Sequence, residues 1–188
     1  MNKVIIDMSM SLDGYVAGPG DSPELPLGKN GEVLHAWLDD PEALGRGYDE
    51  PGEAPAAIIM GRRTYDNSQP WWNGSGPMGD TPCFVLTKEA PTKAGTMFTF
   101  ITEGGVEAAL AQARKVAGDK NIGLMGANVD QQFLRAGLVD EVRIHLIPVL
   151  LGNGLSLFGN LGIMTMLKKR KVVDGPEGTH ISYSVERA

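Results

Sequence analysis

Segments with strand periodicity alternate with segments of helical periodicity along most of this chain, and this alternation restricts the folds open to it. The first strand is predicted over residues 3–11, where Val4, Ile6, Met8 and Met10 alternate with polar neighbours. The same pattern predicts strands at residues 55–60, 83–87, 97–101, 122–125 and 142–151. Strands that alternate with helices favour a mainly parallel central sheet with helices on both of its faces.

Helices and loops are predicted between these strands. The expected helices cover residues 32–38, 106–116 and 126–134, and a further helix begins at 61–65. Gly- and Pro-rich loops are predicted at 17–31 and 67–82. Two consecutive strand patterns, at 165–173 and 179–186, predict an antiparallel hairpin at the C-terminal edge of the sheet. No linker separates these parts, so residues 1–188 are expected to form a single three-layer α/β domain.

Charge and composition argue against several classes of function. The net charge of −6 over 188 residues disfavours a general nucleic-acid or membrane-surface binder, which would need a basic face. No stretch approaches the ~20 apolar residues of a membrane-spanning helix. Cys83 is the only cysteine, so no internal disulfide can form and a cytoplasmic location is expected. A small anionic ligand is still compatible, because it requires only a local basic cluster.

Two arginines, Arg62 and Arg63, follow the second predicted strand at the start of a predicted helix. The helix dipole is positive there, so each cation costs about 0.3–1 kcal/mol unless something offsets it. A phosphate would gain from the free backbone N–H groups, from the dipole and from both guanidinium groups. Two solvated surface arginines explain the pattern equally well when it is considered alone.

Two more strand ends have a similar character. Thr87-Lys88 supplies a hydroxyl and an ammonium where ligands of open α/β sheets bind, although an ordinary strand exit explains it at least as well. Gly126-Ala127-Asn128 would let the backbone approach a pyrophosphate closely, although a tight turn needs glycine anyway. The combination of three strand ends favours a dinucleotide that carries an additional 2′-phosphate.

Several motifs occur in an order that resembles the dihydrofolate reductase superfamily. They are Ser9-Met10-Ser11-Leu12-Asp13-Gly14, Met60-Gly61-Arg62-Arg63-Thr64-Tyr65, Val85-Leu86-Thr87-Lys88, and Gly137-Leu138-Val139-Asp140-Glu141 running on to the 148–154 segment. Pro148-Val149-Leu150-Leu151-Gly152-Asn153-Gly154, followed by Leu157-Phe158, resembles one branch of that superfamily. This branch contains the reductase domain of the bifunctional riboflavin-biosynthesis deaminase-reductase (the RibD C-terminal domain) and its stand-alone relatives. The motifs span nearly the whole chain, and the resemblance implies a dihydrofolate reductase-like fold and an NADPH-dependent oxidoreductase.

The resemblance also implies roles for individual residues around NADPH. The phosphates would be held by the start of the second predicted helix and by the following strand end, at Gly61, Arg62, Arg63, Thr64, Thr87 and Lys88. The pyrophosphate and nicotinamide ribose would lie on Gly126, Ala127, Asn128 and Val129. The nicotinamide would be lined by Ser9, Val16 and Ala17. Where this chain has Met125-Gly126, members of the family usually have two glycines.

The substrate side of the site is less well marked. A dihydrofolate reductase places a carboxylate on its first long helix, whereas Asp39 and Asp40 come late in the corresponding segment. Asp13 is the candidate catalytic residue, although its position before Gly14 is also typical of a turn. Four aromatic residues could wall a substrate pocket, or could equally anchor loops or a dimer contact: Tyr15, Trp37, Trp71 and Trp72.

No metal site is expected. The three histidines His35, His145 and His180 are far apart in sequence, and Cys83 has no cysteine partner. His145 lies in the middle of a predicted strand and is interpreted as a packed or solvated residue.

The sequence and the resemblance together predict an NADPH-dependent reductase. It would transfer hydride to a small heterocycle or a ribosylated pyrimidine, as a 5-amino-6-(5-phosphoribosylamino)uracil reductase or a dihydrofolate reductase does. The alternative is a non-catalytic NADP(H)-binding or ligand-sensing protein that kept the cofactor cleft. A homodimer is expected to form through the apolar stretches at 147–151 and 161–166.

Overall fold

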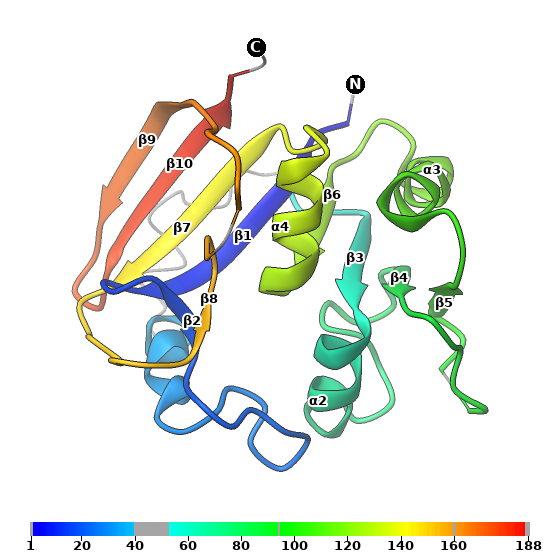
Figure 1. Cartoon of the computed structure of the whole chain (residues 1–188), viewed down its shortest axis with the longest axis horizontal. Helices are drawn as coiled ribbons and strands as arrows, with labels where there is room; N and C mark the ends of the chain where they lie inside the picture. The colour runs from blue at the N-terminus through cyan, green and yellow to red at the C-terminus, as the bar shows by residue number, and fades with distance from the viewer. Residues whose placement is uncertain (1, 40–52, 94, 160, 187–188) are drawn as a thin grey trace.

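The computed structural model describes residues 2–39, 53–93, 95–159 and 161–186. Eight strands form one sheet in the order β5-β4-β3-β6-β1-β7-β10-β9 (Figure 1). Their bounds are Val4–Ser11 for β1, Ala57–Gly61 for β3, Cys83–Leu86 for β4, Phe98–Ile101 for β5, Ile122–Met125 for β6, Glu141–Ile147 for β7, Leu167–Asp174 for β9 and Thr179–Val185 for β10. Both ends of the sheet are therefore formed by strands that lie far from the N-terminus in sequence.

In the order of the sheet, the strands β5, β4, β3, β6, β1 and β7 all run parallel to one another. β10 pairs antiparallel with both β7 and β9, so the C-terminal hairpin forms the antiparallel edge of the sheet. The predicted sheet architecture is thus confirmed. A second, two-stranded sheet pairs β2 (Tyr15–Ala17) with β8 (Leu155–Ser156). Neither of these strands is long enough to show a periodicity, so this small sheet is not predictable from the sequence pattern.

Two helices cover one face of the large sheet. α3 (Gly105–Ala117) and α4 (Ala127–Arg135) pack on the strands through the largest group of buried apolar residues. This group includes Val4, Ile6, Ile59, Leu110, Leu124, Phe133 and Ile144. Burying one such side chain contributes about 1.5–3 kcal/mol, so this layer contains most of the hydrophobic stabilisation.

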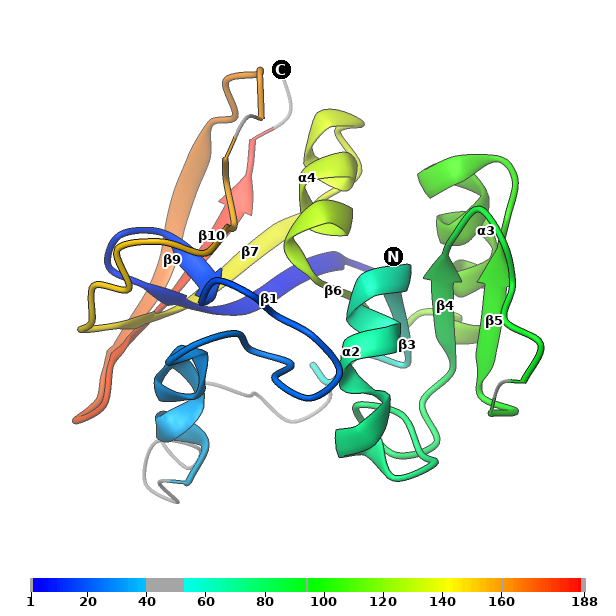
Figure 2. The same cartoon turned by 60° about the horizontal axis from the view of Figure 1, so that its bottom comes forward.

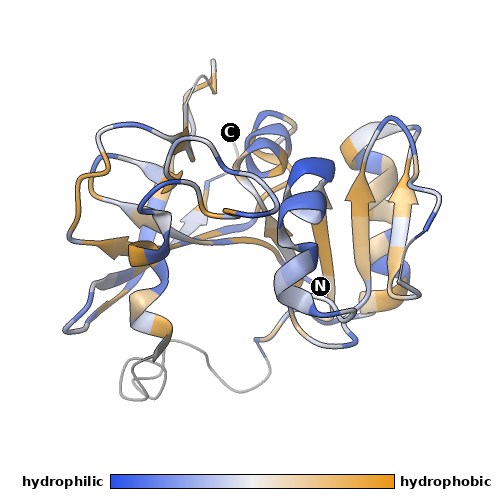
Figure 3. Cartoon of the chain, turned by 90° about the horizontal axis from the view of Figure 1, so that it is seen from below, coloured by the Kyte–Doolittle hydropathy of each residue, from blue (hydrophilic) through white to orange (hydrophobic). Residues whose placement is uncertain are grey.

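Two other helices lie on the opposite face, as predicted (Figures 1 and 2). α2 (Arg62–Trp72) packs through Tyr65 against a second buried cluster, and the 3₁₀ helix η1 (Gly31–Asp39) packs through Leu34 and Trp37 against Ile147. Figure 3 shows that the strands beside α2 are mainly hydrophobic, whereas α2 itself is mainly hydrophilic. Among the described residues, no helix combines the length and the apolar character that crossing a bilayer requires.

Two predicted boundaries are wrong. The loop predicted at 67–82 begins only after Trp72, because α2 continues through Pro70 to Trp72 and is capped by Asn73, whose φ is 45°. A proline near the end of a helix removes one backbone hydrogen bond, which the rest of this helix tolerates. The strand predicted at 142–151 ends at Ile147. Pro148 has no N–H with which to continue the ladder of hydrogen bonds.

Asp130 lies in the first turn of α4, and its carboxyl group is buried in the core. Among the described residues, none hydrogen-bonds to either of its side-chain oxygens. Burial raises the pKa of Asp130 well above its ordinary value of 3.8. An acid whose pKa rises on folding favours the folded state only while it is protonated. The protein therefore loses stability as the pH increases from the unfolded pKa towards the folded pKa.

We expect Asp130→Asn to raise the free energy of unfolding, and to raise it more at pH 8 than at pH 5. Ionising one group costs up to about 1.4 kcal/mol per pH unit within the window between its unfolded and folded pKa values. Urea unfolding at both pH values measures the difference. Asp119→Asn, which removes an exposed carboxylate, is the matched control. The same pH dependence in the wild type and in Asp130→Asn would contradict the assignment.

Candidate functional site

The three predicted anion-binding segments meet at one edge of the sheet. β3, β4 and β6 are parallel neighbours, with Gly61 paired to Leu86 and Met60 paired to Met125 near their carboxyl ends. The segments at 61–64, 87–88 and 126–129 follow directly from these strand ends. Because the carboxyl ends of parallel strands share an edge, segments far apart in sequence are brought side by side.

The two helices that start at this edge each follow a glycine and have no side-chain cap. Gly61 precedes α2 and Gly126 precedes α4, and neither helix start has a capping side chain. The first backbone N–H groups of a helix are then open to an anion. Gly126 has a φ of 105°, and a Cβ at this position would lie 2.3 Å from Oγ1 of Thr64. Only glycine therefore allows α2 and α4 to start so close together.

Arg62 joins the start of α2 to the chain that follows β4. Its Nε contacts both carboxylate oxygens of Asp66 at 2.8 and 2.9 Å, and its Nη1 donates to the carbonyl of Glu89 at 2.9 Å. The hydroxyl of Thr87 donates to the same carbonyl at 2.8 Å. Lys88 is exposed next to them. The structure thus brings together four groups predicted to contact phosphates, at Arg62, Thr64, Thr87 and Lys88.

Arg63 has a carboxylate partner. Its Nε and Nη2 each lie 2.7 Å from a carboxylate oxygen of Asp21, and Asn67 donates to the same carboxylate at 2.9 Å. These contacts anchor the predicted loop at 17–31 to α2. The Arg63 side chain is 69% exposed, so its guanidinium lies at the rim of the edge. A phosphate at this position would compete with Asp21 for Arg63.

The residues predicted to line a nicotinamide lie beside β2. Val16 and Ala17 are buried in this strand. Gly154 approaches it so closely that a Cβ would lie 2.0 Å from the Ala17 carbonyl oxygen. Ser9 is buried in β1, where its hydroxyl accepts a hydrogen bond from Trp37 Nε1 at 2.9 Å. β2 lies beside β1 because the chain folds back through the turn at residues 12–14.

Asp13 holds two turns together. It accepts hydrogen bonds from the Ser11 hydroxyl at 2.6 Å and from the backbone N–H groups of Leu151 and Gly152 at 3.1 and 2.7 Å. The Ser11 hydrogen bond is the main cause of a lowered pKa at Asp13, assisted by the backbone donors. A carboxylate held in its ionised form is a poor proton donor, so this geometry favours the turn role over catalysis.

The four aromatic residues predicted for a substrate pocket are not brought together. Trp71 and Trp72 lie at the far end of the 11-residue α2, about 15 Å from its first residue. Trp72 stacks on Phe98, with ring centroids 5.9 Å apart, and Trp71 is exposed. Trp37 is buried on the sheet, and Tyr15 is half-buried in β2. Asp40 and the side chain of Asp39 lie outside the described residues.

A row of polar side chains crosses the sheet face under η1, and the sequence pattern did not identify it. His145 Nε2 lies 2.8 Å from the Asp7 carboxylate, and His145 Nδ1 lies 2.6 Å from His180 Nδ1. The Trp37 ring stacks on His145 with a centroid distance of 3.9 Å. Burial and the proximity of His145 lower the pKa of His180, which favours its neutral form at pH 7. The Asp7 side chain is 37% exposed, so the row of polar side chains is open to solvent at Asp7.

The sequence contains a signal for this row of polar side chains, but the strand register is needed to identify which residues meet. Asp7 and Ser9 of β1 alternate with apolar residues, and so do Arg143 and His145 of β7. The register pairs Asp7 with Arg143 and Ser9 with His145, so all four side chains lie on one face. Polar alternation in two buried strands could have suggested a shared polar face, but not which residues meet.

The fold defines the class of protein. A mainly parallel eight-stranded sheet, covered by helices on both faces and closed by an antiparallel C-terminal hairpin, is the dihydrofolate reductase-like fold. The chain belongs to the RibD C-terminal domain family, whose model matches residues 2–181.

Relatives and solved structures agree with this membership. The uncharacterized protein YwjB of Bacillus subtilis (strain 168) is 28% identical over 182 residues, which cover 96% of this chain and 97% of YwjB. A crystal structure from Shewanella sp. PV-4, of a protein that its name assigns provisionally to riboflavin biosynthesis, has a TM-score of 0.72. It is 24% identical, and the match covers 98% of this chain and 99% of that one. Dihydrofolate reductase from Enterococcus faecalis, in complex with NADP(H), has a TM-score of 0.60 at 15% identity, covering 98% and 97%.

Proposed function

We propose that this protein is an NADPH-dependent reductase that acts on a small heterocyclic substrate, such as a pterin or a ribosylated pyrimidine. The observation that carries the proposal is the meeting of three strand ends, with two uncapped helix starts and the cations Arg62 and Lys88, at one edge of the sheet. The likeness to a dihydrofolate reductase that binds NADP(H) supports it. When bound, the cofactor would supply the hydride.

The residues at the edge fit the phosphates of such a cofactor. The N–H groups that start α2 and α4 would bind the pyrophosphate oxygens, and Gly126 would keep side-chain atoms out of the way. Thr87 and Lys88 would hold the 2′-phosphate, with Arg63 at the rim. Val16, Ala17 and Ser9 would form the wall beside the nicotinamide. The protein's contribution is placement of the reacting groups and supply of a proton.

The proton source that the geometry favours is the pair formed by Asp7 and His145. Asp7 lies two residues before Ser9 on the same face of β1, which puts it about 7 Å along the strand from the nicotinamide wall. Its carboxylate is partly exposed and lies 2.8 Å from Nε2 of His145, so the two side chains share a hydrogen bond. A substrate that lies over Asp7 would therefore have an acid group next to the reduced atom.

The proposal is tested by NADPH titration followed by turnover. We expect saturable binding, monitored by nicotinamide fluorescence, and oxidation of NADPH in the presence of at least one member of a panel of pterins, flavin precursors and quinones. Asp7→Asn should bind NADPH normally and oxidise it about 100-fold more slowly, which is the lower end of general acid catalysis. Asp119→Asn, an exposed carboxylate far from the site, is the control.

Each outcome of this test has a separate meaning. Failure to bind any dinucleotide would overturn the reductase proposal. Normal turnover by Asp7→Asn would overturn only the role of Asp7. Binding without turnover across the panel would favour the second candidate function, a non-catalytic NADP(H)-binding or ligand-sensing protein. Asp13 supports this second candidate, because the carboxylate predicted to be catalytic is used to hold two turns.

We also propose that the protein is a homodimer located in the cytoplasm. Ile163, Met164 and Met166 are exposed before β9, as expected for a surface that pairs with a second copy. Of the other predicted stretch, Leu150 is exposed but Ile147 is buried against η1 and is not available for such a contact. Sedimentation velocity distinguishes the 20.1 kDa monomer from a dimer of twice that mass.

A further inference from the structure

Two buried histidines meet on the face of the sheet that η1 covers. His145 of β7 and His180 of β10 are register partners in the antiparallel ladder, so their side chains lie on the same face. His145 is 3% exposed and His180 is 2% exposed. Their Nδ1 atoms lie 2.6 Å apart, and Nε2 of His145 lies 2.8 Å from the Asp7 carboxylate. The row of polar side chains therefore runs from Asp7 through His145 to His180.

The short distance between the two Nδ1 atoms links the tautomers of the rings. A neutral imidazole has one N–H donor and one acceptor nitrogen, and a hydrogen bond between two Nδ1 atoms has room for one proton. If Nδ1 of His180 carries it, Nδ1 of His145 accepts, and the proton of His145 lies on Nε2. If Nδ1 of His145 carries it instead, Nε2 of His145 is an acceptor and the proton of His180 lies on Nε2. Two neutral rings therefore have two arrangements.

Asp7 selects between these arrangements. An ionised carboxylate can only accept a hydrogen bond, so it favours a proton on Nε2 of His145 and hence on Nδ1 of His180. Arg143 Nη1 lies 4.0 Å from the other Asp7 oxygen and attracts the ionised carboxylate. Burial, and then the proximity of His145, lower the pKa of His180 against a smaller opposing effect of Asp7. The neutral His180 that this favours is the form that can take either arrangement.

Trp37 keeps both rings in place. Its ring stacks on His145 at a centroid distance of 3.9 Å and an interplanar angle of 19°, and it meets His180 edge-on at 5.0 Å. The indole is itself fixed, because its Nε1 donates to the Ser9 hydroxyl. A His145 ring that turned over would exchange Nδ1 for a carbon atom and lose its hydrogen bond to His180. The two arrangements therefore differ in the positions of protons and not in the positions of the rings.

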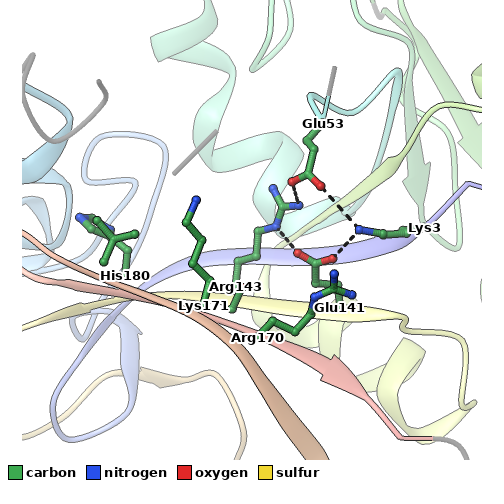
Figure 4. Close-up of a pocket in the computed structure, with 9 residues that line it drawn as sticks. Lys3, Glu53, Glu141, Arg143, Arg170, Lys171 and His180 are labelled. Carbon is green, nitrogen blue, oxygen red and sulfur yellow. Dashed lines mark hydrogen bonds and ion pairs between the residues drawn. The ribbon is translucent and has the colours of Figure 1, made fainter. Parts of the chain in front are cut away.

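His180 also lines a polar pocket of about 250 Å³ (Figure 4). Arg170 and Lys171 of β9 line it as well, because a β-bulge in the pairing of β9 with β10 brings two consecutive side chains to one face. A polar pocket of this size has room for several water molecules. The row of polar side chains therefore ends at solvent on the Asp7 side and at this pocket on the His180 side.

We propose that His180 is a positioning residue for Asp7, which acts through His145 to determine whether Asp7 accepts a hydrogen bond or donates one. This inference rests on the proposed function, in which Asp7 is the acid group. Asp7 accepts while Nδ1 of His180 carries the proton, and a protonated Asp7 donates to Nε2 of His145 only after both rings have changed tautomer.

The change of tautomers is balanced. One proton from solvent joins Nε2 of His180, the Nδ1 proton of His180 moves to Nδ1 of His145, and the Nε2 proton of His145 moves to Asp7. Three bonds to hydrogen form and three break, so the row gains one proton in total and both rings stay neutral. A change of protonation at Asp7 therefore has a signature at His180.

The first test reads the tautomers by NMR of isotope-labelled histidine rings at pH 8, where imidazoles are ordinarily neutral. We expect the Nδ1–H tautomer at His180 and the Nε2–H tautomer at His145. Asp7→Leu can neither accept nor donate, so it should lower the Nδ1–H share of His180 from nearly all to about half. The control is His35→Gln, because the pKa of His35 is lowered by burial and by His145, yet His35 lies outside the row. It should leave both tautomers unchanged.

The second test compares two replacements of His180 that packing and hydrogen bonding rank in opposite order. Phenylalanine fills the space of the imidazole without a hydrogen bond, whereas the asparagine amide can donate to Nδ1 of His145 or accept from it. We expect His180→Phe to lower kcat by about tenfold or more with an unchanged KM, and His180→Asn to keep kcat within about threefold of the wild type. Circular dichroism checks that both variants are folded.

The two tests separate the failure of this inference from that of the proposed function. The Nε2–H tautomer at His180 in the wild type, or the same tautomer share in Asp7→Leu, would overturn the inference. So would a higher kcat in His180→Phe than in His180→Asn, because His180 would then only fill space. If the wild type oxidises no NADPH, the reductase proposal fails, and the tautomers alone decide whether His180 orders the row.

Discussion

Under the proposed function, replacing Lys88 with alanine is expected to lower the ratio of NADPH affinity to NADH affinity by about 10- to 100-fold. Lys88 is exposed at the carboxyl edge of the sheet, next to Thr87. NADPH differs from NADH only in its 2′-phosphate, so loss of a cation that contacts this phosphate weakens NADPH binding and leaves NADH binding unchanged. Dissociation constants for both cofactors, obtained from nicotinamide fluorescence, give the ratio.

The control is Lys93→Ala, which removes an exposed cation from the same loop after β4. It should alter the ratio less than twofold. An unchanged preference in Lys88→Ala would show that this lysine does not contact the 2′-phosphate. Equal losses of NADPH and NADH affinity would instead place Lys88 at a phosphate that both cofactors share.

The proposed contact of Arg63 with NADPH can be tested with two variants that should have opposite effects. Arg63→Ala should also lower the NADPH preference, because a guanidinium at the rim is removed. Asp21→Asn should raise NADPH affinity a few-fold, because the carboxylate that now holds Arg63 loses its charge while Asn67 keeps a side-chain partner. If Asp21→Asn leaves both affinities unchanged, Arg63 serves to anchor the 17–31 loop and has no part in cofactor binding.

Arg143→Met is expected to lower the free energy of unfolding by about 3 kcal/mol at pH 7. The Arg143 side chain is 5% exposed and pairs with Glu141, which is 6% exposed, and with Glu53. Removing the arginine leaves the Glu141 carboxylate buried with Lys3 as its remaining partner. An uncompensated buried charge costs more than the pair contributed, so the loss exceeds that of an exposed ion pair. Urea unfolding monitored by circular dichroism gives the value.

The pH dependence gives an independent check on this assignment. Burial alone would raise the pKa of Glu141, but hydrogen bonds from Arg143 and Lys3 outweigh it and hold the pKa below its ordinary value of 4.5. A depressed pKa stabilises the folded state above the unfolded pKa, and this stabilisation disappears as the pH falls through the folded pKa. The destabilisation by Arg143→Met should therefore be largest at neutral pH and shrink towards pH 3.

Two further variants complete the Arg143 experiment. Adding Glu141→Gln to Arg143→Met removes the buried charge and should restore a large part of the lost stability. Arg114→Met, on the exposed side of α3, should change stability by less than about 0.5 kcal/mol. If Arg143→Met loses no more stability than Arg114→Met, the ion pairs of Arg143 with Glu141 and Glu53 do not contribute to the stability of the fold.

The fold was largely predictable because its signals are local. Alternation of strand and helix patterns implies parallel strands, and two consecutive strand patterns at the C-terminus imply a hairpin. The prediction failed where a single residue type was given too much weight. Pro70 and the glycines after it suggested a loop, yet the helix that begins at Arg62 runs to Trp72. Trp71 and Trp72 accordingly lie at the end of a helix, away from the carboxyl edge of the sheet.

The sequence by itself determined which segments would meet at the carboxyl edge of the sheet. Gly61, Thr87 and Gly126 each follow a strand, and parallel strands bring their carboxyl ends to one side whatever the details of packing. Only the tertiary structure decided which polar side chains meet on the face of the sheet. The contact of Asp7 with His145 depends on the register between strands 138 residues apart in sequence, and the approach of Arg170 and Lys171 to one pocket depends on a bulge. Register and bulges arise from packing over the whole sheet, so no local pattern specifies them.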